Sequence, residues 1–287
     1  MQTNEISVPA NKVLLADCIS IMQNLPANSI DFILTDPPYL VRYQDRDGRS
    51  IQNDNNSDWL VPAFNECHRV LKQDSFMVSF YGWTQVDRFF SAWRGAGFRI
   101  VGHLVFRKTY TSKSRFLKYQ HEQAFLLAKG NPTMPQNPVA DVIDMPYSGN
   151  RFHPTQKPVA ALKPLIEAFT QMQDLVFDPF CGSGSTLVAA KVLHRRYLGV
   201  EVDEQYYGAA LKRLHPVGIR MPLCHLVSRM HPLHSVRSYD LTHIRALDRF
   251  RYTNPVINTL YSFENNVLFR RKEQLRTARG NPSHRAV

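Results

Sequence analysis

The sequence predicts an α/β fold, in which a Rossmann-like, doubly wound and mostly parallel sheet has helices on both faces. Strand and helix patterns alternate along residues 1–214, and repeated βα units close as parallel strand pairs joined by crossover helices. In addition, two buried apolar runs end in Asp-Pro turns, at 36–37 and at 178–179. The carboxyl ends of parallel strands are where such folds bind ligands.

The first elements follow from apolar runs and from the residues that end them. Residues 13–16 predict a short strand, and residues 20–25 predict a short helix that Pro26 ends. The run at 30–35 is bounded by turn residues and is typical of a buried parallel strand. A strand-helix-strand order is therefore expected at the start of the chain.

A polar segment separates these elements from the next helix. Residues 42–56 are rich in Asp, Asn, Gly and Ser and lack periodicity, so we expect a mobile loop. Asp58 is the expected N-cap of a helix with an apolar stripe, which consists of Leu60, Phe64, Cys67, Val70 and Leu71. The later elements are predicted in this order: strand 76–80, helix 84–93, strands 99–106 and 123–127, helix 159–172, strand 175–177, helix 185–193, strand 197–200 and helix 203–214.

Composition narrows the class of protein. The 287 residues are 44% hydrophobic, which is ample for a core, and no apolar run approaches the roughly 18–20 residues of a membrane span. Residues 1–5 lack the basic-then-apolar order of a signal peptide. The four cysteines form no Cys-x-x-Cys pair, so we expect neither a disulfide framework nor a bound metal. A cytoplasmic protein with free thiols is the simplest interpretation.

Most of the net charge of +11 lies in the last quarter of the chain. Residues 1–214 contain 23 Lys and Arg against 20 Asp and Glu, whereas residues 215–287 contain 12 against 4. Such an excess suits a polyanionic partner, most simply nucleic acid. The tail lacks a periodic apolar face, so we expect it to be disordered or loosely packed. A nucleic-acid-binding arm and a segment without a role remain alternatives, and the folded domain is expected to end at 214.

Residues 36–39, Asp-Pro-Pro-Tyr, are the most informative segment. Two successive prolines remove two N–H donors, so the chain cannot continue the sheet or begin a helix there. Backbone carbonyls are then free beside the Asp36 carboxylate, and the Tyr39 ring follows. Acceptors next to a stacking surface suit an amino group on a flat ring. The alternative is an ordinary proline turn at the end of a strand.

A second segment, 177–186, also leads from a strand into a helix. Gly182 and Gly184 allow the backbone to approach a ligand at the helix N-terminus. The lysine of a phosphate-binding loop and the third glycine of the dinucleotide fingerprint are missing, so a small nucleoside-like ligand fits better than a triphosphate. Glu201 ends the next strand, where such folds bind ribose hydroxyls.

These segments resemble the β group of amino-methylating DNA methyltransferases, which use S-adenosyl-L-methionine. In that group the Asp-Pro-Pro-Tyr strand precedes the glycine-rich strand, as it does here. The resemblance covers about residues 11–214 and includes Asp17 and the segment 153–158, His-Pro-Thr-Gln-Lys-Pro. It implies the class I methyltransferase fold in its circularly permuted motif order, with residues 1–214 as the catalytic domain.

The resemblance also implies roles for single residues. The catalytic segment is Asp36, Pro37, Pro38 and Tyr39, in which Asp36 and the Pro37 carbonyl accept from the target amino group and Tyr39 stacks on the target base. The implied cofactor pocket contains Asp17, Thr155, Gln156, Lys157, Asp178, Phe180, Gly182, Gly184 and Glu201. In it, Asp17 accepts from the adenine amino group of the cofactor and Glu201 from the ribose hydroxyls. Residues 155–157 close the pocket near the methionine part; a surface lysine is the alternative for Lys157.

The target base also follows from the resemblance. An acidic residue before the two prolines is similar to the N6-adenine enzymes, whereas serine is more usual in N4-cytosine enzymes. Methylation of adenine N6 in double-stranded DNA is therefore implied. An N4-cytosine enzyme, an RNA methyltransferase and an inactive DNA-binding relative are the alternatives. The sequence does not decide whether the chain forms a homodimer or works with a cognate restriction endonuclease.

Basic residues near the strand ends are the expected DNA contacts. Residues 107–119 contain five basic residues, three aromatic residues and no acidic ones, which suits phosphate contact and base stacking. A solvated basic loop is the alternative. The expected DNA-binding residues are Arg42, Arg107, Lys108, Lys113, Arg115 and Lys118. The implied target-recognition region, 107–152, is short, which favours a short or permissive target.

Overall fold

The computed structural model describes residues 8–44, 48, 50–112 and 116–215, all within one compact unit, Met1–Arg220. The described strands form one sheet in the order β1-β8-β7-β2-β3-β5-β4-β6. Neighbouring strands are parallel, except that β5 is antiparallel to β3 and β4. The strands are β1 (Lys12–Leu15), β2 (Ile30–Thr35), β3 (Leu71–Phe80), β4 (Arg99–Ser112), β5 (Tyr119–Lys129), β6 (Val142–Met145), β7 (Leu175–Asp178) and β8 (Arg196–Glu201).

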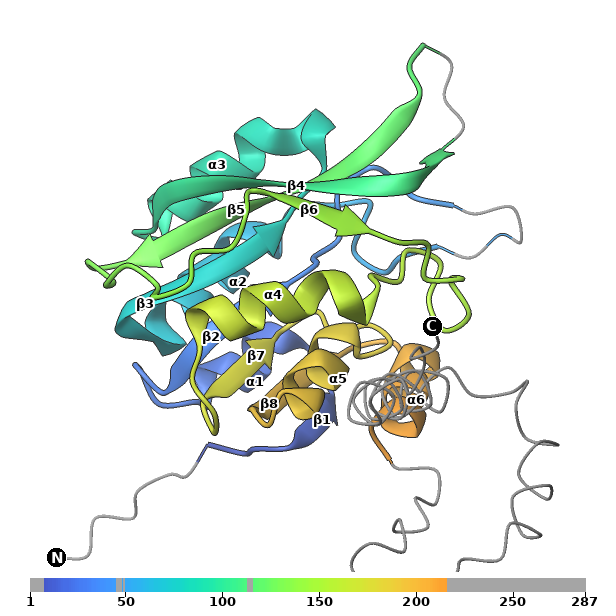
Figure 1. Cartoon of the computed structure of the whole chain (residues 1–287). Helices are drawn as coiled ribbons and strands as arrows, with labels where there is room; N and C mark the ends of the chain where they lie inside the picture. Colours follow the sequence, from blue (N-terminus) through green and yellow to red (C-terminus); the bar gives the residue numbers. More distant parts are fainter. Residues whose placement is uncertain (1–7, 45–47, 49, 113–115, 216–287) are drawn as a thin grey trace, which may run out of the picture. The chain divides into compact units, whose positions relative to one another are not determined.

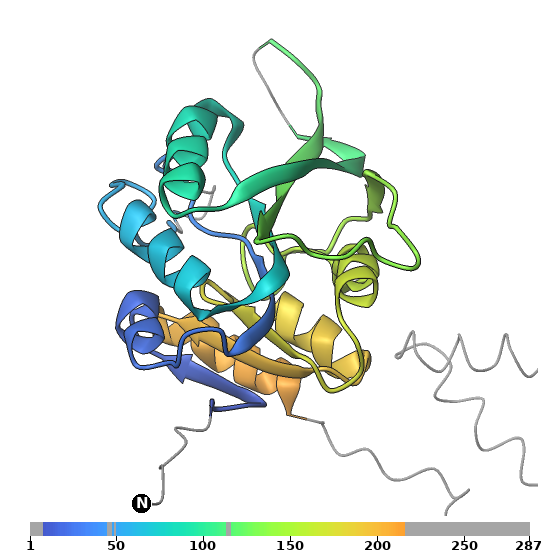
Figure 2. The ribbon, with the colours of Figure 1, turned by 90° about the vertical axis from the view of Figure 1, so that its left-hand side faces the viewer.

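Helices cover both faces of this sheet (Figures 1 and 2). One face carries α1 (Cys18–Gln23), α2 (Leu60–Val70) and α3 (Val86–Gly95), and the other carries α4 (Val159–Phe169), α5 (Ser185–Val192) and α6 (Glu204–Leu214). Two hydrophobic clusters lie between these layers, and β2 contributes Ile33 to one and Phe32 to the other. Successive side chains of a strand point to opposite faces, so a strand buried on both sides must be apolar on both. The doubly wound α/β fold is thus confirmed.

The strand order brings the two motif-bearing strands together. β2 pairs in parallel with β7, so their carboxyl ends lie at the same edge of the sheet. The turns that follow Thr35 and Asp178 therefore leave the sheet from neighbouring positions. The Thr35 hydroxyl donates a hydrogen bond of 2.9 Å to Oδ1 of Asp178, which ties the two strand ends to each other inside the core.

The outer part of the sheet differs from the sequence prediction. β4 and β5 pair as far as Ser112 and Tyr119, so residues 107–112 are a strand and not part of a basic loop. The sequence pattern also missed β6, which pairs in parallel with β4. This strand has four residues, which is too short for an alternating pattern to stand out, and a neighbouring strand stabilises it.

Some helix ends also differ from the prediction. α2 begins after Trp59 without a side-chain cap, so the expectation that Asp58 caps it was wrong. The Asp58 N–H is bonded to Oδ1 of Asn56 at 3.2 Å, which places Asp58 in the preceding turn. The helix predicted at 84–93 begins as a 3₁₀ turn, η1 (Trp83–Gln85), and continues as α3.

α6 ends at Leu214, where the last helix was predicted to end, and the limit of the catalytic domain at this residue stays a prediction. Apart from His215, the tail at 215–287 lies outside the described residues, so its loose packing stays a prediction. No helix in the described part of the chain is long and apolar enough to span a membrane.

Candidate active site

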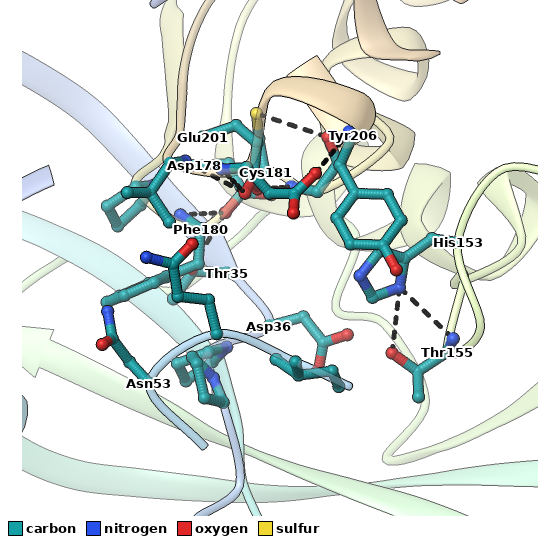
Figure 3. Close-up of a pocket in the computed structure, with 18 of the residues that line it drawn as sticks. Thr35, Asp36, Asn53, His153, Thr155, Asp178, Phe180, Cys181, Glu201 and Tyr206 are labelled. Atoms are coloured by element: carbon teal, nitrogen blue, oxygen red, sulfur yellow. Dashed lines mark hydrogen bonds between the residues drawn. The ribbon is translucent and has the colours of Figure 1, made fainter. Parts of the chain in front are cut away.

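A pocket opens where β1, β2, β7 and β8 end (Figure 3). Its walls come from the Asp-Pro-Pro-Tyr segment, the glycine-rich turn, residues 153–157 and part of the loop at 41–54. The predicted site residues that line it are Asp17, Asp36, Pro37, Pro38, Tyr39, Thr155, Gln156, Lys157, Asp178, Phe180, Gly182 and Glu201. The topology thus gathers these segments and the ends of β1 and β8, which lie far apart in the sequence, around one cavity.

Gly184 is the predicted cofactor residue that does not line the pocket. Its φ is +79°, and a Cβ on it would come within 3.1 Å of the Ala210 Cβ on α6. A left-handed backbone conformation and a close neighbour at the Cβ position both favour glycine over any residue with a side chain. Gly184 therefore lets α5 begin close to α6. It affects the pocket indirectly, because it sets the shape of the glycine-rich turn that lines the pocket.

Glu201, at the end of the neighbouring strand β8, holds the glycine-rich turn in place through a hydrogen bond. Its Oε2 accepts from the Gly182 N–H at 2.7 Å, and its Oε1 accepts from the N–H groups of Val202 and Asp203 at 3.0 and 2.8 Å. A carboxylate offers about four acceptor positions, so capacity remains for a ligand hydroxyl. Burial raises the pKa of Glu201, and these three N–H groups oppose that rise.

The Asp178 carboxyl is buried between the two strand ends. Its Oδ1 accepts from the Thr35 hydroxyl and, at 3.1 Å, from the Phe180 N–H. Burial raises its pKa to about 7, against the opposing effect of hydrogen bonds from Thr186, Thr35 and Phe180. A carboxyl that gains its proton this close to neutrality makes the folded state sensitive to pH.

Replacing Asp178 with asparagine should reduce this sensitivity. Between the ordinary value of 3.8 and about 7, the folded carboxyl holds a proton that the unfolded one has lost, so stability falls as the pH rises through this window. Asparagine has no proton to lose. In thermal unfolding without cofactor, the melting temperature of Asp178→Asn relative to the wild type should therefore rise with pH across the window. A difference that stays constant with pH would contradict the buried, protonated carboxyl.

The Asp-Pro-Pro-Tyr segment is held by an ion pair that the sequence did not indicate. Lys157 Nζ lies 2.5 Å from Oδ2 of Asp36 and donates to the Tyr39 hydroxyl at 3.2 Å. The Tyr39 hydroxyl in turn donates to Oδ1 of Asp36 at 2.7 Å. A further carboxylate, Glu122 on β5, lies 3.1 Å from the same ammonium. Burial disfavours the charged lysine, but Asp36 and Glu122 raise its pKa well above the ordinary value.

The rest of the pocket supplies aromatic surface and further polar groups. The Phe180 ring meets Trp59 edge-on at 5.0 Å between ring centres. His153 packs on Tyr206 at 4.2 Å, and its Nδ1 accepts from the Thr155 N–H at 3.2 Å. Asp17 lines the pocket and also caps α1, because its Oδ1 accepts from the Ser20 N–H at 2.9 Å.

Five residues that line the pocket were not predicted from the sequence, namely Thr35, Asn53, Trp59, His153 and Tyr206. Two of them had a usable signal, because Thr35 directly precedes Asp36 and His153 opens the His-Pro-Thr segment. Asn53 and Trp59 had none, since they lie in or beside a polar stretch without periodicity. Figure 3 shows Asn53 on the side of the cavity where Asp36 and Thr35 lie.

Two of the residues expected to contact DNA, Arg107 and Lys108, lie close to carboxylates of the protein itself. Arg107 is exposed but pairs with Asp144 on β6, 2.8 Å from its Nε. The side chain of Lys108 is only 7% exposed and lies 3.9 Å from Glu122, so the alternative of a solvated basic loop does not hold for this residue. Arg42 and Lys118 are exposed, whereas Lys113 and Arg115 lie outside the described residues.

The residues present fit S-adenosyl-L-methionine. Glu201 and Asp17 are carboxylates suited to hydroxyl and amino groups, and Gly182, with a φ of +50°, lets the backbone come close to a ligand. Phe180 adds a flat apolar wall. Cys181 is not a candidate nucleophile, because burial raises its pKa well above the ordinary value and keeps the thiol protonated.

Comparison with known proteins agrees with this fit. The family model described as DNA methylase, for N6 and N4 methyltransferases, matches residues 30–151 and 146–212. YubD of Escherichia coli strain K12, a protein named as a methylase, is 56% identical over 207 residues, which is 72% of this chain and 91% of YubD. The DNA adenine methyltransferase YhdJ of the same strain is 28% identical over 244 residues, 71% of this chain and 83% of YhdJ.

Solved structures share the fold at lower identity. The complex of M1.HpyAVI with S-adenosylmethionine has a TM-score of 0.59 at 24% identity and covers 71% of this chain and 98% of its own. The cytosine-N4-specific PvuII DNA methyltransferase has a TM-score of 0.61 at 16% identity and covers 77% of this chain and 92% of its own. The chain belongs to the N6/N4 family of DNA methylases, enzymes of the class I methyltransferase fold that use S-adenosyl-L-methionine to methylate DNA.

Proposed function

We propose that the pocket methylates the N6 amino group of an adenine that has left a DNA duplex. One observation carries the proposal: the Asp-Pro-Pro-Tyr turn leaves β2 directly beside the glycine-rich turn of β7, and Thr35 and Asp178 join the two strand ends at 2.9 Å. A target amino group and a methyl donor can therefore meet in one cavity. When bound, S-adenosyl-L-methionine supplies an electrophilic methyl group on a sulfonium.

In this proposal Asp36 activates the target nitrogen. The lone pair of an exocyclic amino group is delocalised into the ring, which makes it a weak nucleophile. A carboxylate that accepts from the amino N–H favours a pyramidal nitrogen with a more localised lone pair, and it can hold the proton that the nitrogen loses. Burial raises the pKa of Asp36, which strengthens it as an acceptor, while Lys157 works in the opposite direction. Positioning and electrostatics supply most of the rate in such a site.

The aromatic ring of Tyr39 serves the flipped base in the same proposal. The base must leave the duplex to reach the cavity, at a cost of about a few kcal/mol. Stacking on an aromatic side chain offsets about 1–3 kcal/mol of that cost. The hydroxyl of Tyr39 is already bonded to Asp36, so the same residue orients the carboxylate and offers its ring to the base.

Adenine is favoured over cytosine by two observations. The first residue of the motif is acidic, as in the N6-adenine enzymes that this segment resembles, and YhdJ, at 28% identity, is named as a DNA adenine methyltransferase. The fold itself does not discriminate between adenine and cytosine as the target base, because the cytosine-N4-specific PvuII enzyme has the same fold. Both amino groups present the same N–H donors, so the base must be identified directly.

The experiment supplies duplex DNA of mixed sequence and S-adenosyl-L-methionine, and digests the product to nucleosides for mass spectrometry. N6-methyldeoxyadenosine is the expected product. N4-methyldeoxycytidine in its place would overturn the choice of base but not the family. A parallel reaction with RNA of the same sequence should give no product, and product from RNA alone would overturn DNA as the substrate. Absence of product from a chain that binds the cofactor would identify an inactive relative.

A further inference from the structure

The environment of Lys157 contains more charge than a simple ion pair. Its Nζ has Oδ2 of Asp36 at 2.5 Å, Oε2 of Glu122 at 3.1 Å and the Tyr39 hydroxyl at 3.2 Å, so three oxygens surround an ammonium that has three donors. The ammonium also lies over the ring of Phe80, 4.7 Å from its centre. The side chain of Lys157 is 6% exposed, against 24% for Asp36 and 27% for Glu122.

Glu122 reaches this cluster from the outer half of the sheet. It lies on β5, opposite Phe106 of β4, and it is not among the residues that line the pocket. On its other side Lys108 of β4 lies 3.9 Å away. The charges therefore alternate from the pocket outward, in the order Asp36, Lys157, Glu122 and Lys108, and their formal sum is zero.

We propose that Glu122 is a positioning residue for methyl transfer: it shares the Lys157 ammonium and so leaves the Asp36 carboxylate available to the target amino group. The inference rests on the proposed role of Asp36. An ammonium paired with Asp36 alone would draw that carboxylate toward itself and weaken it as an acceptor. A second carboxylate on the same ammonium divides the attraction, and Lys108 in turn balances the second carboxylate.

The charged and titratable groups around Asp36 determine how its pKa should change when the charge of Glu122 is removed. Lys157 precedes α4, Tyr39 follows β2 and Asp178 ends β7, while Glu122, Lys108 and Tyr110 belong to β5 and β4. The Lys157 ammonium lowers the pKa of Asp36, and the negative charge of Glu122 raises it. Removing only the charge of Glu122 should therefore lower the pH at which Asp36 titrates, without touching the cofactor side of the pocket.

The test uses the full chain and the isosteric variant Glu122→Gln. Carboxyl carbon NMR of ¹³C-aspartate-labelled protein, with Asp36→Asn to identify the signal, reports the titration of Asp36 in the absence of cofactor and DNA. The signal should titrate at lower pH in Glu122→Gln than in the wild type. With DNA and S-adenosyl-L-methionine, the acidic limb of the single-turnover rate should move to lower pH, and the plateau should fall by about 10–100-fold, as for a reacting group that is held less well.

Two further variants separate the charge effect from damage to the fold. Glu167→Gln removes one exposed carboxylate from α4 and should leave the titration and the rate unchanged. Glu122→Asp keeps the charge and should restore most of the wild-type titration, which a loss of packing alone would not do. The inference would be overturned if a folded Glu122→Gln variant kept the wild-type titration of Asp36 and the wild-type single-turnover rate. It would also be overturned if Glu167→Gln showed the same shifts as Glu122→Gln. An active Asp36→Asn would instead overturn the proposed function, so the two failures are distinguishable.

Discussion

Asp36→Ala should lose methyl transfer by about 10²–10³-fold or more, the range for removal of a single preorganised electrostatic contact. The cofactor should still bind within about twofold of the wild-type affinity, because Asp36 contacts Tyr39 and Lys157 and not the glycine-rich turn. Single-turnover methylation of duplex DNA measures the first quantity, and isothermal calorimetry with S-adenosyl-L-methionine measures the second. Near-normal turnover in this variant would remove the proposed mechanism.

Tyr39 provides the matched comparison for this result. Tyr39→Phe keeps the ring and removes the hydroxyl, which donates to Asp36 at 2.7 Å and accepts from Lys157 at 3.2 Å. Because Lys157 still holds Asp36, a loss of a few-fold is expected, in line with about 0.5–1.5 kcal/mol for a hydrogen bond. Tyr39→Ala also removes the ring and should impair turnover much more. Equal losses in the two variants would show that the ring does not hold the base.

Glu201→Ala should weaken the binding of S-adenosyl-L-methionine by about 2–3 kcal/mol, which is roughly 30–150-fold. The variant loses the carboxylate proposed for the ribose, and it also leaves the N–H groups of Gly182, Val202 and Asp203 without their acceptor. The shape of the glycine-rich turn should therefore loosen as well. Calorimetry gives the affinity, and thermal unfolding without cofactor gives the contribution to stability.

Glu204→Ala is the control for this variant. Glu204 is an exposed carboxylate in the first turn of α6, three residues from Glu201, and its loss removes the same formal charge from the same region. It should change the affinity by less than about 1 kcal/mol, the range of a helix-dipole effect. Unchanged affinity in Glu201→Ala would mean that the cofactor pocket has been placed wrongly.

The parts of the fold that were predictable from the sequence are local. The strand at 30–35 was predicted with its observed bounds, because a strand buried on both faces is apolar along its length and proline ends it. The helix predicted at 203–214 is α6, which begins one residue later because Asp203 caps it by accepting from the Tyr206 N–H at 3.0 Å. In contrast, β6 is too short to show a pattern and the paired ends of β4 and β5 are polar, so these segments are strands only because a neighbouring strand pairs with them.

The sequence by itself determined which residue types stand at the strand ends and in what order, because turns, prolines and glycines act on their own neighbourhood. Through the family resemblance that these residues carry, it implied the class I methyltransferase fold, the cofactor and the role of the segment around Asp36. Only the tertiary structure decided which charges meet there. Lys157 lies 121 positions from Asp36 along the chain, and Glu122 comes from a strand with no motif. Such contacts depend on strand order and register, and buried charges are stable only where the fold brings their partners within a few ångströms.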